Sequence, residues 1–419
     1  MSRLRPGIHA SVANACFFVF DWQTALSSLP RPILFVGNPP WVTSAGMGVI
    51  GGDNLPSKAN HGGLRGLDAM TGKSNFDIAE TILLRLLDLA EGCQGSIAML
   101  CKTSVARRIL LHAWRSNLGI DAEMHSIDAK REFDVSVDSC LLLLRTGSRR
   151  NTCPVYPTFS SSSPCSEVGF LDETLIADVE DYRTYRRLRG SGKSAWRSGI
   201  KHDCAAVMEL RHTPAGHVNG LGENVAVEAE VLFPLLKSSD IANGTATPSL
   251  SMIVPQSRLS QDTSELEHRA PNAWKYLCSH AAQLDARKSS IYRSRPRFAI
   301  FGVGDYSFSP FKVCISGLYK RLAFTLVEPY QGKPVVLDDT VYFLPANSRE
   351  QAVLLHRLLN SEPSLRFLKS MIFWDAKRPI TGDILSRLDI AALARENGVD
   401  PRDLATVAPA APAKQGLFD

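Results

Sequence analysis

The first third of the sequence alternates short apolar runs with longer stretches of helical periodicity, and this alternation constrains the fold more than any other feature. Residues 33–36 form an apolar run bounded by prolines and Gly37, which predicts a buried strand that ends in a turn. Apolar residues recur at helical spacing from Phe76 to Glu91, which predicts an amphipathic helix. Further strands are expected over 96–101, 122–127 and 135–144, with a helix over 104–117. This order predicts an α/β domain with a mostly parallel sheet and helices on both faces.

A change of composition marks the end of this α/β domain. Ser, Pro, Thr and Arg dominate between Thr146 and Pro164, including the serine run 160–163, and such a stretch cannot support a hydrophobic core. With 419 residues and 44% hydrophobic content, two domains are the natural expectation. The expected division is an α/β domain over 1–150, a linker over 151–166, a mixed α+β domain over 167–396 and a flexible tail over 397–419.

Charge and cysteine content say little about function. The formal net charge of +5 permits a polyanionic partner but does not require one. The nine cysteines are scattered, without a CxxC pair or a spacing typical of a metal site, so we expect reduced thiols, no metal and a cytoplasmic protein. An apolar patch over 17–20 is interrupted by Asp21 and is too short to span a membrane.

Asn38, Pro39, Pro40 and Trp41 directly follow the first predicted strand, at the edge of the sheet where open α/β folds build their sites. The amide oxygen of Asn38 and the backbone carbonyl of Pro39 could accept the two hydrogens of a planar amine and concentrate electron density on its nitrogen. The two prolines restrict the backbone, and Trp41 offers a flat apolar face to an extruded base. The alternative is that Asn-Pro-Pro forms only a rigid turn.

This stretch resembles motif IV of the N6-adenine DNA methyltransferase family. Residues 73–80 resemble motif V, 95–102 motif VI and 133–137 motif VIII of the same family. The resemblance implies a Rossmann-like class I sheet that binds S-adenosylmethionine, with Phe76 and Asp77 in the methyl-donor pocket. It also implies that Phe133 packs against the flipped base opposite Trp41, although Phe133 could equally be a core aromatic residue at a strand edge.

The long region after these motifs is similar to the gamma motif order, in which a target-recognition domain follows the catalytic motifs. Asn at position 38 favours adenine N6 over cytosine N4 within this resemblance. The implied function is site-specific methylation of double-stranded DNA in a restriction-modification system, with a cognate restriction endonuclease as a possible partner. Two alternatives are a protein-glutamine methyltransferase and a catalytically incomplete DNA-binding fragment.

The resemblance is incomplete at the start of the chain. Family members carry a glycine-rich motif I upstream of motif IV, but 37 residues precede Asn38 and none forms such a motif. Residues 17–22 resemble a remnant of motif III, which makes Asp21, together with Asn38, a candidate cofactor contact. We therefore expect a half sheet with an open edge at 33–36. A misplaced start codon, a degraded gene or a separate polypeptide that supplies the other half would each explain it.

Basic residues interleaved with aromatic ones form two clusters in the second predicted domain. Such clusters suit DNA, because cations neutralise phosphates while aromatic rings stack or wedge. Either cluster could instead be a solvated helix face. The candidate DNA contacts are Arg187, Lys193, Arg197, Lys201, Arg293, Arg295 and Lys312.

Overall fold

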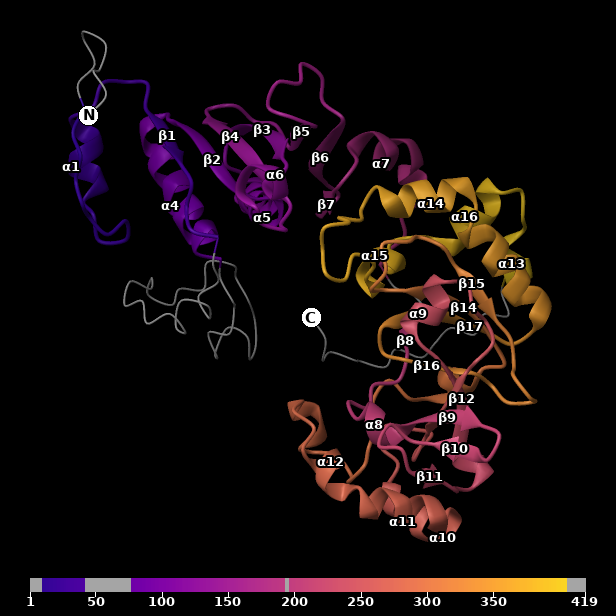
Figure 1. Ribbon diagram of the computed structural model, residues 1–419. Helices are drawn as coiled ribbons and strands as arrows, with labels where there is room; N and C mark the ends of the chain where they lie inside the picture. Colours follow the sequence, from indigo (N-terminus) through magenta and orange to yellow (C-terminus); the bar gives the residue numbers. More distant parts are fainter. Residues whose placement is uncertain (1–9, 42–76, 193–195, 405–419) are drawn as a thin grey trace. The chain divides into compact units, whose positions relative to one another are not determined.

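The chain divides into two compact units, Met1–Val179 and Glu180–Asp419. The computed structural model describes residues 10–41, 77–192 and 196–404 (Figure 1). The boundary between the units lies after the predicted linker 151–166, and that prediction is wrong, because a strand of the first unit occupies residues 152–156 and the next one starts at Ser166.

The first unit is built on a seven-stranded sheet with the strand order β1-β2-β4-β3-β5-β6-β7. The strands are β1 (Leu34–Gly37), β2 (Ser96–Lys102), β3 (Ile120–Ile127), β4 (Ser139–Thr146), β5 (Thr152–Tyr156), β6 (Ser166–Leu171) and β7 (Thr174–Ile176). β1 and β2 are parallel, as are β3 and β5, but β4 runs antiparallel between β2 and β3. The expected mostly parallel sheet is thus mixed. The link from β3 to β4 is too short for a parallel crossover, so the chain turns back.

Helices of the first unit cover one face of this sheet. They are α1 (Trp22–Ser27), α4 (Ile78–Cys93), α5 (Thr103–Arg115) and the short α6 (Ala129–Phe133). α4 and α5 pack against each other and against β2, whose residues alternate between buried and half-buried. The expected cover on both faces is therefore found on one face within the described residues, and Leu100, Leu141 and Leu143 on the other face stay half-buried.

β1 lies at one edge of the sheet among the described residues. It pairs with β2 on one side, and no described strand pairs with its other side. Phe35 is buried, whereas Leu34 and Val36 are 60% and 71% exposed. An edge strand with exposed apolar side chains is a template for pairing with another segment of polypeptide.

The second unit contains two sheets. One has the order β11-β10-β9-β13-β12-β16 and the other the order β15-β14-β17-β8. Their strands are β8 (Arg197–Ser198), β9 (Glu209–Thr213), β10 (Gly216–Val218), β11 (Asn224–Val225), β12 (Leu232–Leu236), β13 (Leu250–Ile253), β14 (Phe311–Ser316), β15 (Thr325–Val327), β16 (Val336–Leu337) and β17 (Val341–Ala346). All pairs within the second unit are antiparallel except β12 with β16, so the expected α+β class describes this unit.

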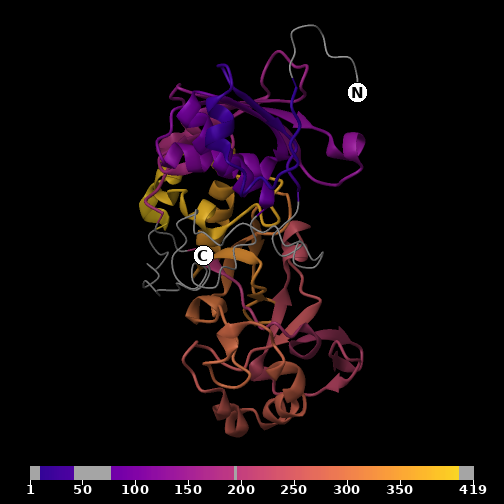
Figure 2. The ribbon, with the colours of Figure 1, turned by 90° about the vertical axis from the view of Figure 1, so that its left-hand side faces the viewer.

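Each sheet of the second unit carries its own helices, and each sheet with its helices is called a lobe here. The helices are α7 (Val179–Tyr185), α8 (Ala205–Met208), α9 (Ser238–Ala242), α10 (Leu266–Arg269), α11 (Pro271–Ser279), α12 (Ala281–Asp285), α13 (Arg349–Leu359), α14 (Glu362–Lys369), α15 (Gly382–Ser386) and α16 (Ile390–Glu396). α10, α11 and α12 lie at one end of the unit, and the helices after β17 lie at the other, in both Figure 1 and Figure 2.

Three chain segments cross at close range where the two lobes meet. A Cβ atom on Gly199 would lie 2.1 Å from the carbonyl oxygen of Asp338, and one on Gly302 would lie 2.3 Å from the carbonyl oxygen of Gly199. Gly302 also has a φ of +69°, which favours glycine. The backbone of Lys201 exchanges two hydrogen bonds of 2.9 Å with Phe301. The crossing joins the lobes through backbone contacts that side chains at these glycines would prevent.

Three further predictions concern the cysteines, the C-terminal tail and membrane-spanning segments. All nine cysteines are free thiols, and five of them are buried. The predicted flexible tail begins too early, because a 3-10 helix at Pro401–Leu404 packs with Leu404 buried, and residues 405–419 lie outside the described residues. Among the described residues, no helix has the length and hydropathy needed to cross a membrane.

Candidate active site

Asn38 to Trp41 follow β1 directly, at the carboxyl end of the strand. The side chain of Asn38 is exposed and has no hydrogen-bond partner within the described residues, whereas Pro39 is buried. The parallel neighbour β2 ends at the same edge of the sheet, and β4 starts there, opposite Lys102. The structure therefore places the exposed amide of Asn38 at the carboxyl edge of the sheet, with no hydrogen-bond partner in the part of the chain that it describes.

Trp41 and Phe133 lie in contact, and their ring centroids are 5.9 Å apart. The rings are nearly perpendicular, at 82°, so together they form an aromatic corner. Perpendicular rings at this distance leave no parallel-walled slot, so a base would stack on one ring and meet the edge of the other. Phe133 is 46% exposed at the end of α6, which makes the alternative of a core aromatic untenable. The indole Nε1 of Trp41 is buried without a hydrogen-bond partner among the described residues.

Asp77 holds the start of α4. Its Oδ1 accepts the backbone N–H of Ala79 at 3.1 Å, and its Oδ2 accepts a hydrogen bond of 2.6 Å from the ammonium of Lys102 at the end of β2. The residue is 4% exposed. Both carboxylate oxygens are thus engaged within the protein, which favours a structural role for Asp77 over direct contact with a cofactor. Phe76, the other candidate from the same motif, lies outside the described residues.

Replacing Asp77 separates these roles. Asp77→Ala is expected to lower the free energy of unfolding of the first unit by about 2–3 kcal/mol, because it removes a helix cap and leaves Lys102 unpaired. Asp77→Asn keeps an oxygen for the Ala79 N–H and should cost less. Denaturant titration followed by circular dichroism measures both. If Asp77→Ala unfolds like the unchanged chain but no longer binds S-adenosylmethionine, Asp77 contacts the cofactor instead.

Asp21, the candidate cofactor contact near the N-terminus, caps α1. Its carboxylate accepts hydrogen bonds from the backbone N–H and the hydroxyl of Thr24, at 3.1 and 2.6 Å. These bonds lower the pKa of Asp21, and the side chain is exposed. Residues 17–20, which resemble a motif III remnant, form turns ahead of this helix. Each carboxylate oxygen accepts one of these bonds and keeps a lone pair that could accept another.

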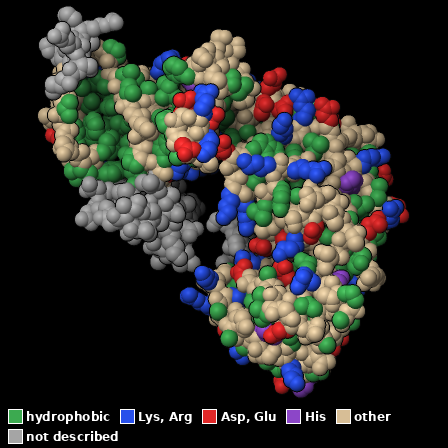
Figure 3. Space-filling view, viewed as in Figure 1, with side chains coloured by type: hydrophobic (Ala, Val, Ile, Leu, Met, Phe, Trp, Pro, Cys, Tyr) green, Lys and Arg blue, Asp and Glu red, His purple; other side chains and the backbone are tan. Residues whose placement is uncertain are grey.

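A hollow of about 470 Å³ opens beside Asn38 and Pro39, over β1, α1 and one side of α4. In Figure 3 hydrophobic side chains line a recess over this part of the first unit. The volume suits a ligand of cofactor size. The apolar walls suit the purine end of S-adenosylmethionine, but none of the described residues that line the hollow is charged, so none can pair with the ammonium and carboxylate of its methionine end. The lining residues are Phe17, Trp22, Leu26, Leu29, Ile33, Leu34, Phe35, Val36, Gly37, Asn38, Pro39, Ile82, Leu86 and Met99.

The candidate DNA contacts of the first basic cluster differ in how free their charges are. Arg187 pairs with Glu396, Nε to Oε2 at 2.8 Å, and Lys201 pairs with Asp203 at 2.7 Å. Arg197 in β8 places its guanidinium 4.9 Å from the ring centroid of Tyr306, and its buried Nε has no hydrogen-bond partner among the described residues. Lys193 lies outside the described residues. None of the three described cations is a simple unpaired surface charge.

The second basic cluster presents two exposed guanidinium groups, and that of Arg295 lies 6.0 Å from the ring centroid of Phe301. Arg293 and Arg295 are exposed, and neither has an ion pair with any described residue. Their loop is held by Arg287, which donates to the carbonyls of Leu284 and Ala299 at 2.8 Å. The guanidinium of Arg287 also lies 3.8 Å from the ring centroid of Tyr292. Arg293 and Arg295 are therefore the candidates best placed to meet phosphates.

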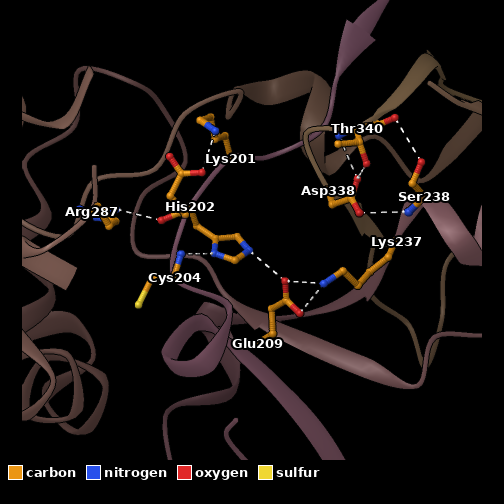
Figure 4. A network of polar contacts seen from close by, with 10 residues as sticks. Lys201, His202, Cys204, Glu209, Lys237, Ser238, Arg287, Asp338 and Thr340 are labelled. Carbon is orange, nitrogen blue, oxygen red and sulfur yellow. Dashed lines mark hydrogen bonds and ion pairs between the residues drawn. The ribbon is translucent and has the colours of Figure 1, made fainter. Parts of the chain in front are cut away.

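A buried polar network lies next to this loop, at the joint between the two lobes (Figure 4). Glu209 accepts hydrogen bonds from Lys237 at 2.8 and 2.9 Å and pairs with Nε2 of His202 at 3.2 Å. Nδ1 of His202 accepts the backbone N–H of Cys204, so Nε2 carries the proton toward Glu209. Burial alone would raise the pKa of Glu209, but the hydrogen bonds from His202 and Lys237 outweigh it and lower the pKa. With every member satisfied, the network stabilises the fold and leaves no reactive group free.

Lys312 does not lie on the surface, and the prediction that it contacts DNA is wrong. It is 1% exposed in β14, where its Nζ donates to the backbone carbonyl of Ser309 at 2.6 Å. Burial lowers the pKa of Lys312 to about 8. The sequence cluster counted its charge, but the apolar neighbours Phe311 and Val313 in the same strand indicate a core position.

The buried ammonium of Lys312 predicts a pH dependence of stability. Between pH 8 and 10.5 the unfolded chain binds more protons at this site than the folded chain, so the free energy of unfolding should rise with pH across this window. Lys312→Met is expected to remove that rise and to stabilise the second unit by about 2 kcal/mol at pH 7. Denaturant titrations at pH 7, 8, 9 and 10 measure it. A destabilised variant that keeps the same rise would contradict the prediction.

The chain was compared with known proteins. No family model matches it. The Type II methyltransferase M.NspV of Nostoc sp. is 43% identical over 385 residues, which cover 90% of this chain and 80% of that protein. The chain belongs to the Type II methyltransferase family.

Two solved structures show weaker similarity to this Type II methyltransferase. The Type IIL restriction-modification enzyme MmeI in complex with DNA aligns at 12% identity and a TM-score of 0.49, over 94% of this chain and 58% of that one. The type IIG restriction endonuclease BpuSI aligns at 13% identity and a TM-score of 0.27, over 77% of this chain and 44% of that one. The chain thus spans less than two thirds of either structure, and the proposals below do not depend on them.

Proposed function

We propose that this Type II methyltransferase transfers a methyl group from S-adenosylmethionine to N6 of adenine in double-stranded DNA. The observation that carries the proposal is the free amide of Asn38 at the open carboxyl edge of the sheet, beside the aromatic corner of Trp41 and Phe133. The relative M.NspV supports methyl transfer, and the resemblance to motif IV supports adenine. An edge-to-face aromatic pair suits a planar base that has left the duplex.

The residues of the chain explain how a weak nucleophile becomes reactive. The lone pair of an exocyclic adenine amine is delocalised into the ring. The Asn38 amide oxygen and the Pro39 carbonyl accept the two amine hydrogens and return electron density to the nitrogen. Trp41 fixes the plane of the base, so that the nitrogen faces the methyl donor along the line of transfer. S-adenosylmethionine, when bound, supplies an electrophilic methyl group on its sulfonium.

The hollow beside Asn38 is the proposed position of the purine end of the methyl donor, and the open edge of β1 is the proposed position of the remaining cofactor contacts. Leu34 and Val36 are exposed there, and the described residues that line the hollow carry no charge. A strand paired along β1, from polypeptide outside the described residues or from a separate chain, would cover both and bring backbone donors to the methionine end. This arrangement is supported by the backbone N–H and C=O groups on the outer side of an edge strand, because they can pair with another strand.

DNA as the substrate is supported by the second unit. Arg293 and Arg295, which are exposed and form no ion pair with a described residue, are proposed to contact phosphates, while Arg187, Arg197 and Lys201 would have to exchange the interactions described above. A protein substrate has no row of phosphates for these cations to neutralise, which favours DNA over a protein glutamine. We place the reaction in the cytoplasm, as part of a restriction-modification system with a cognate endonuclease.

The test is to express the chain in a methylation-deficient bacterial host and to map modified bases in its DNA by single-molecule sequencing. The proposal predicts N6-methyladenine at one short sequence. N4-methylcytosine would keep the enzyme class and overturn the choice of base. Unmodified DNA, together with calorimetry that shows S-adenosylmethionine bound by the purified chain, would point to a different methyl acceptor.

A further inference from the structure

The loop 157–165, which the sequence indicates as a linker, emerges at the catalytic edge of the first unit. β5 runs parallel to β3, and β3 runs antiparallel to β4, which starts opposite the end of β2. The carboxyl ends of β1, β2, β3 and β5 therefore share one edge of the sheet. The loop that leaves β5 lies on the same edge as Asn38.

This loop holds an aromatic side chain out into solvent. Phe159 is 69% exposed, and its ring centroid lies 5.6 Å from that of His125. His125 in turn stacks on Tyr156, with centroids 4.6 Å apart and planes within 9°. The three rings form a platform whose outermost member is Phe159. The ring of Phe159 therefore has most of its surface free to meet a ligand.

Hydrogen bonds give the loop a defined shape. The backbone carbonyl of Thr158 lies 3.4 Å from Nδ1 of His125 and accepts the N–H of Ser161 at 3.3 Å. The hydroxyl of Thr158 bonds those of Ser160 and Ser161 at 3.3 and 2.7 Å. No residue from 157 to 165 is charged. A neutral loop with several hydroxyl donors does not repel a polyanion, and such hydroxyls are common phosphate ligands.

We propose that this loop is a second DNA contact of the catalytic unit, with Phe159 acting as a wedge or stacking surface against base pairs beside the target base. The inference rests on the proposed function, because it takes duplex DNA as the ligand. β5 is four strand spacings from β1, about 19 Å. At about 3.4 Å per base pair, the contact falls roughly five or six base pairs from the target.

The experiment measures binding of fluorescein-labelled duplexes by anisotropy, with the full chain. One duplex carries ten base pairs on each side of the methylated base, and two others are cut to four base pairs on one side. Phe159→Ala is expected to weaken binding of the long duplex roughly tenfold, as for loss of one stacked base. Removal of the flank that contacts the loop should weaken duplex binding by the unchanged chain by a similar factor. The same removal should weaken binding by Phe159→Ala very little further.

Two reference variants separate the possible outcomes. Phe159→Tyr keeps the ring and should bind like the unchanged chain, whereas Asn38→Ala should keep the dependence on duplex length while losing methylation. Equal binding of the long duplex by Phe159→Ala and the unchanged chain would overturn this inference alone. A loss that is the same on all three duplexes would also overturn it, because the contact would then not lie in the flank. Absence of DNA binding by the unchanged chain would contradict the proposed function as well.

Discussion

Asn38→Ala is expected to lower kcat for DNA methylation roughly 100- to 1000-fold, because one of two hydrogen-bond acceptors that activate the amine is lost. Asn38 is exposed and has no hydrogen-bond partner among the described residues, so the substitution should leave the unfolding temperature unchanged. A single-turnover assay with radiolabelled S-adenosylmethionine separates the transfer step from product release. KM for DNA should change much less than kcat, since most of the binding energy comes from other contacts.

The matched control is Asn151→Ala. Asn151 is also exposed, but it precedes β5 and so lies at the opposite edge of the same sheet. Its removal should leave methylation unchanged. If both variants retain full activity, Asn38 does not activate the amine, and the Asn-Pro-Pro segment is the rigid turn of the simpler interpretation. If both lose activity, the loss reflects damage to the first unit.

Gly199→Ala is expected to prevent the second unit from folding, or to destabilise it by about 4 kcal/mol or more. The new Cβ would lie 2.1 Å from the carbonyl oxygen of Asp338 and 2.4 Å from that of Leu337. Both contacts are with backbone, so no side-chain rotation relieves them. Limited proteolysis and calorimetry should show loss of the second unit while the first keeps its transition.

Gly92→Ala is the control substitution, and we expect it to raise stability where Gly199→Ala lowers it. Gly92 lies inside α4, and a Cβ there would meet nothing within 4 Å. Alanine favours a helix more than glycine does, so this variant should stabilise the first unit by up to about 1 kcal/mol. If Gly199→Ala unfolds at the same temperature as the unchanged chain, the close crossing of the lobes does not exist in solution.

Local periodicity was sufficient to predict the catalytic half of the first sheet. β1, α4, β2, α5 and β3 all fall within a few residues of the expected ranges, because each buries one regular apolar face. β5 and β6 were missed, since Pro154 and the serine-rich loop mask short strands whose partners are distant in the sequence. The antiparallel direction of β4 follows from the length of a loop, which hydrophobic patterning does not encode.

In the candidate site, too, some residues could be identified from the sequence and others could not. Asn38 could be found because its surroundings are contiguous in the sequence, and the contact of Trp41 with Phe133 followed from the family resemblance. Lys312 was misjudged, because a count of charges takes no account of burial. The engagement of Asp77 with Lys102 was missed for another reason, since it joins two segments that only the folded sheet brings together.

The close crossing at Gly199 and Gly302 also has a consequence for how the second unit would recognise a DNA sequence. Backbone segments packed at this range restrict the relative motion of the two lobes, so we expect the second unit to meet a duplex as a preformed surface. A duplex that touches both lobes must then adapt its own bend and twist to that surface. The base pairs between the two contacts would be selected by how easily they deform, without being touched at all.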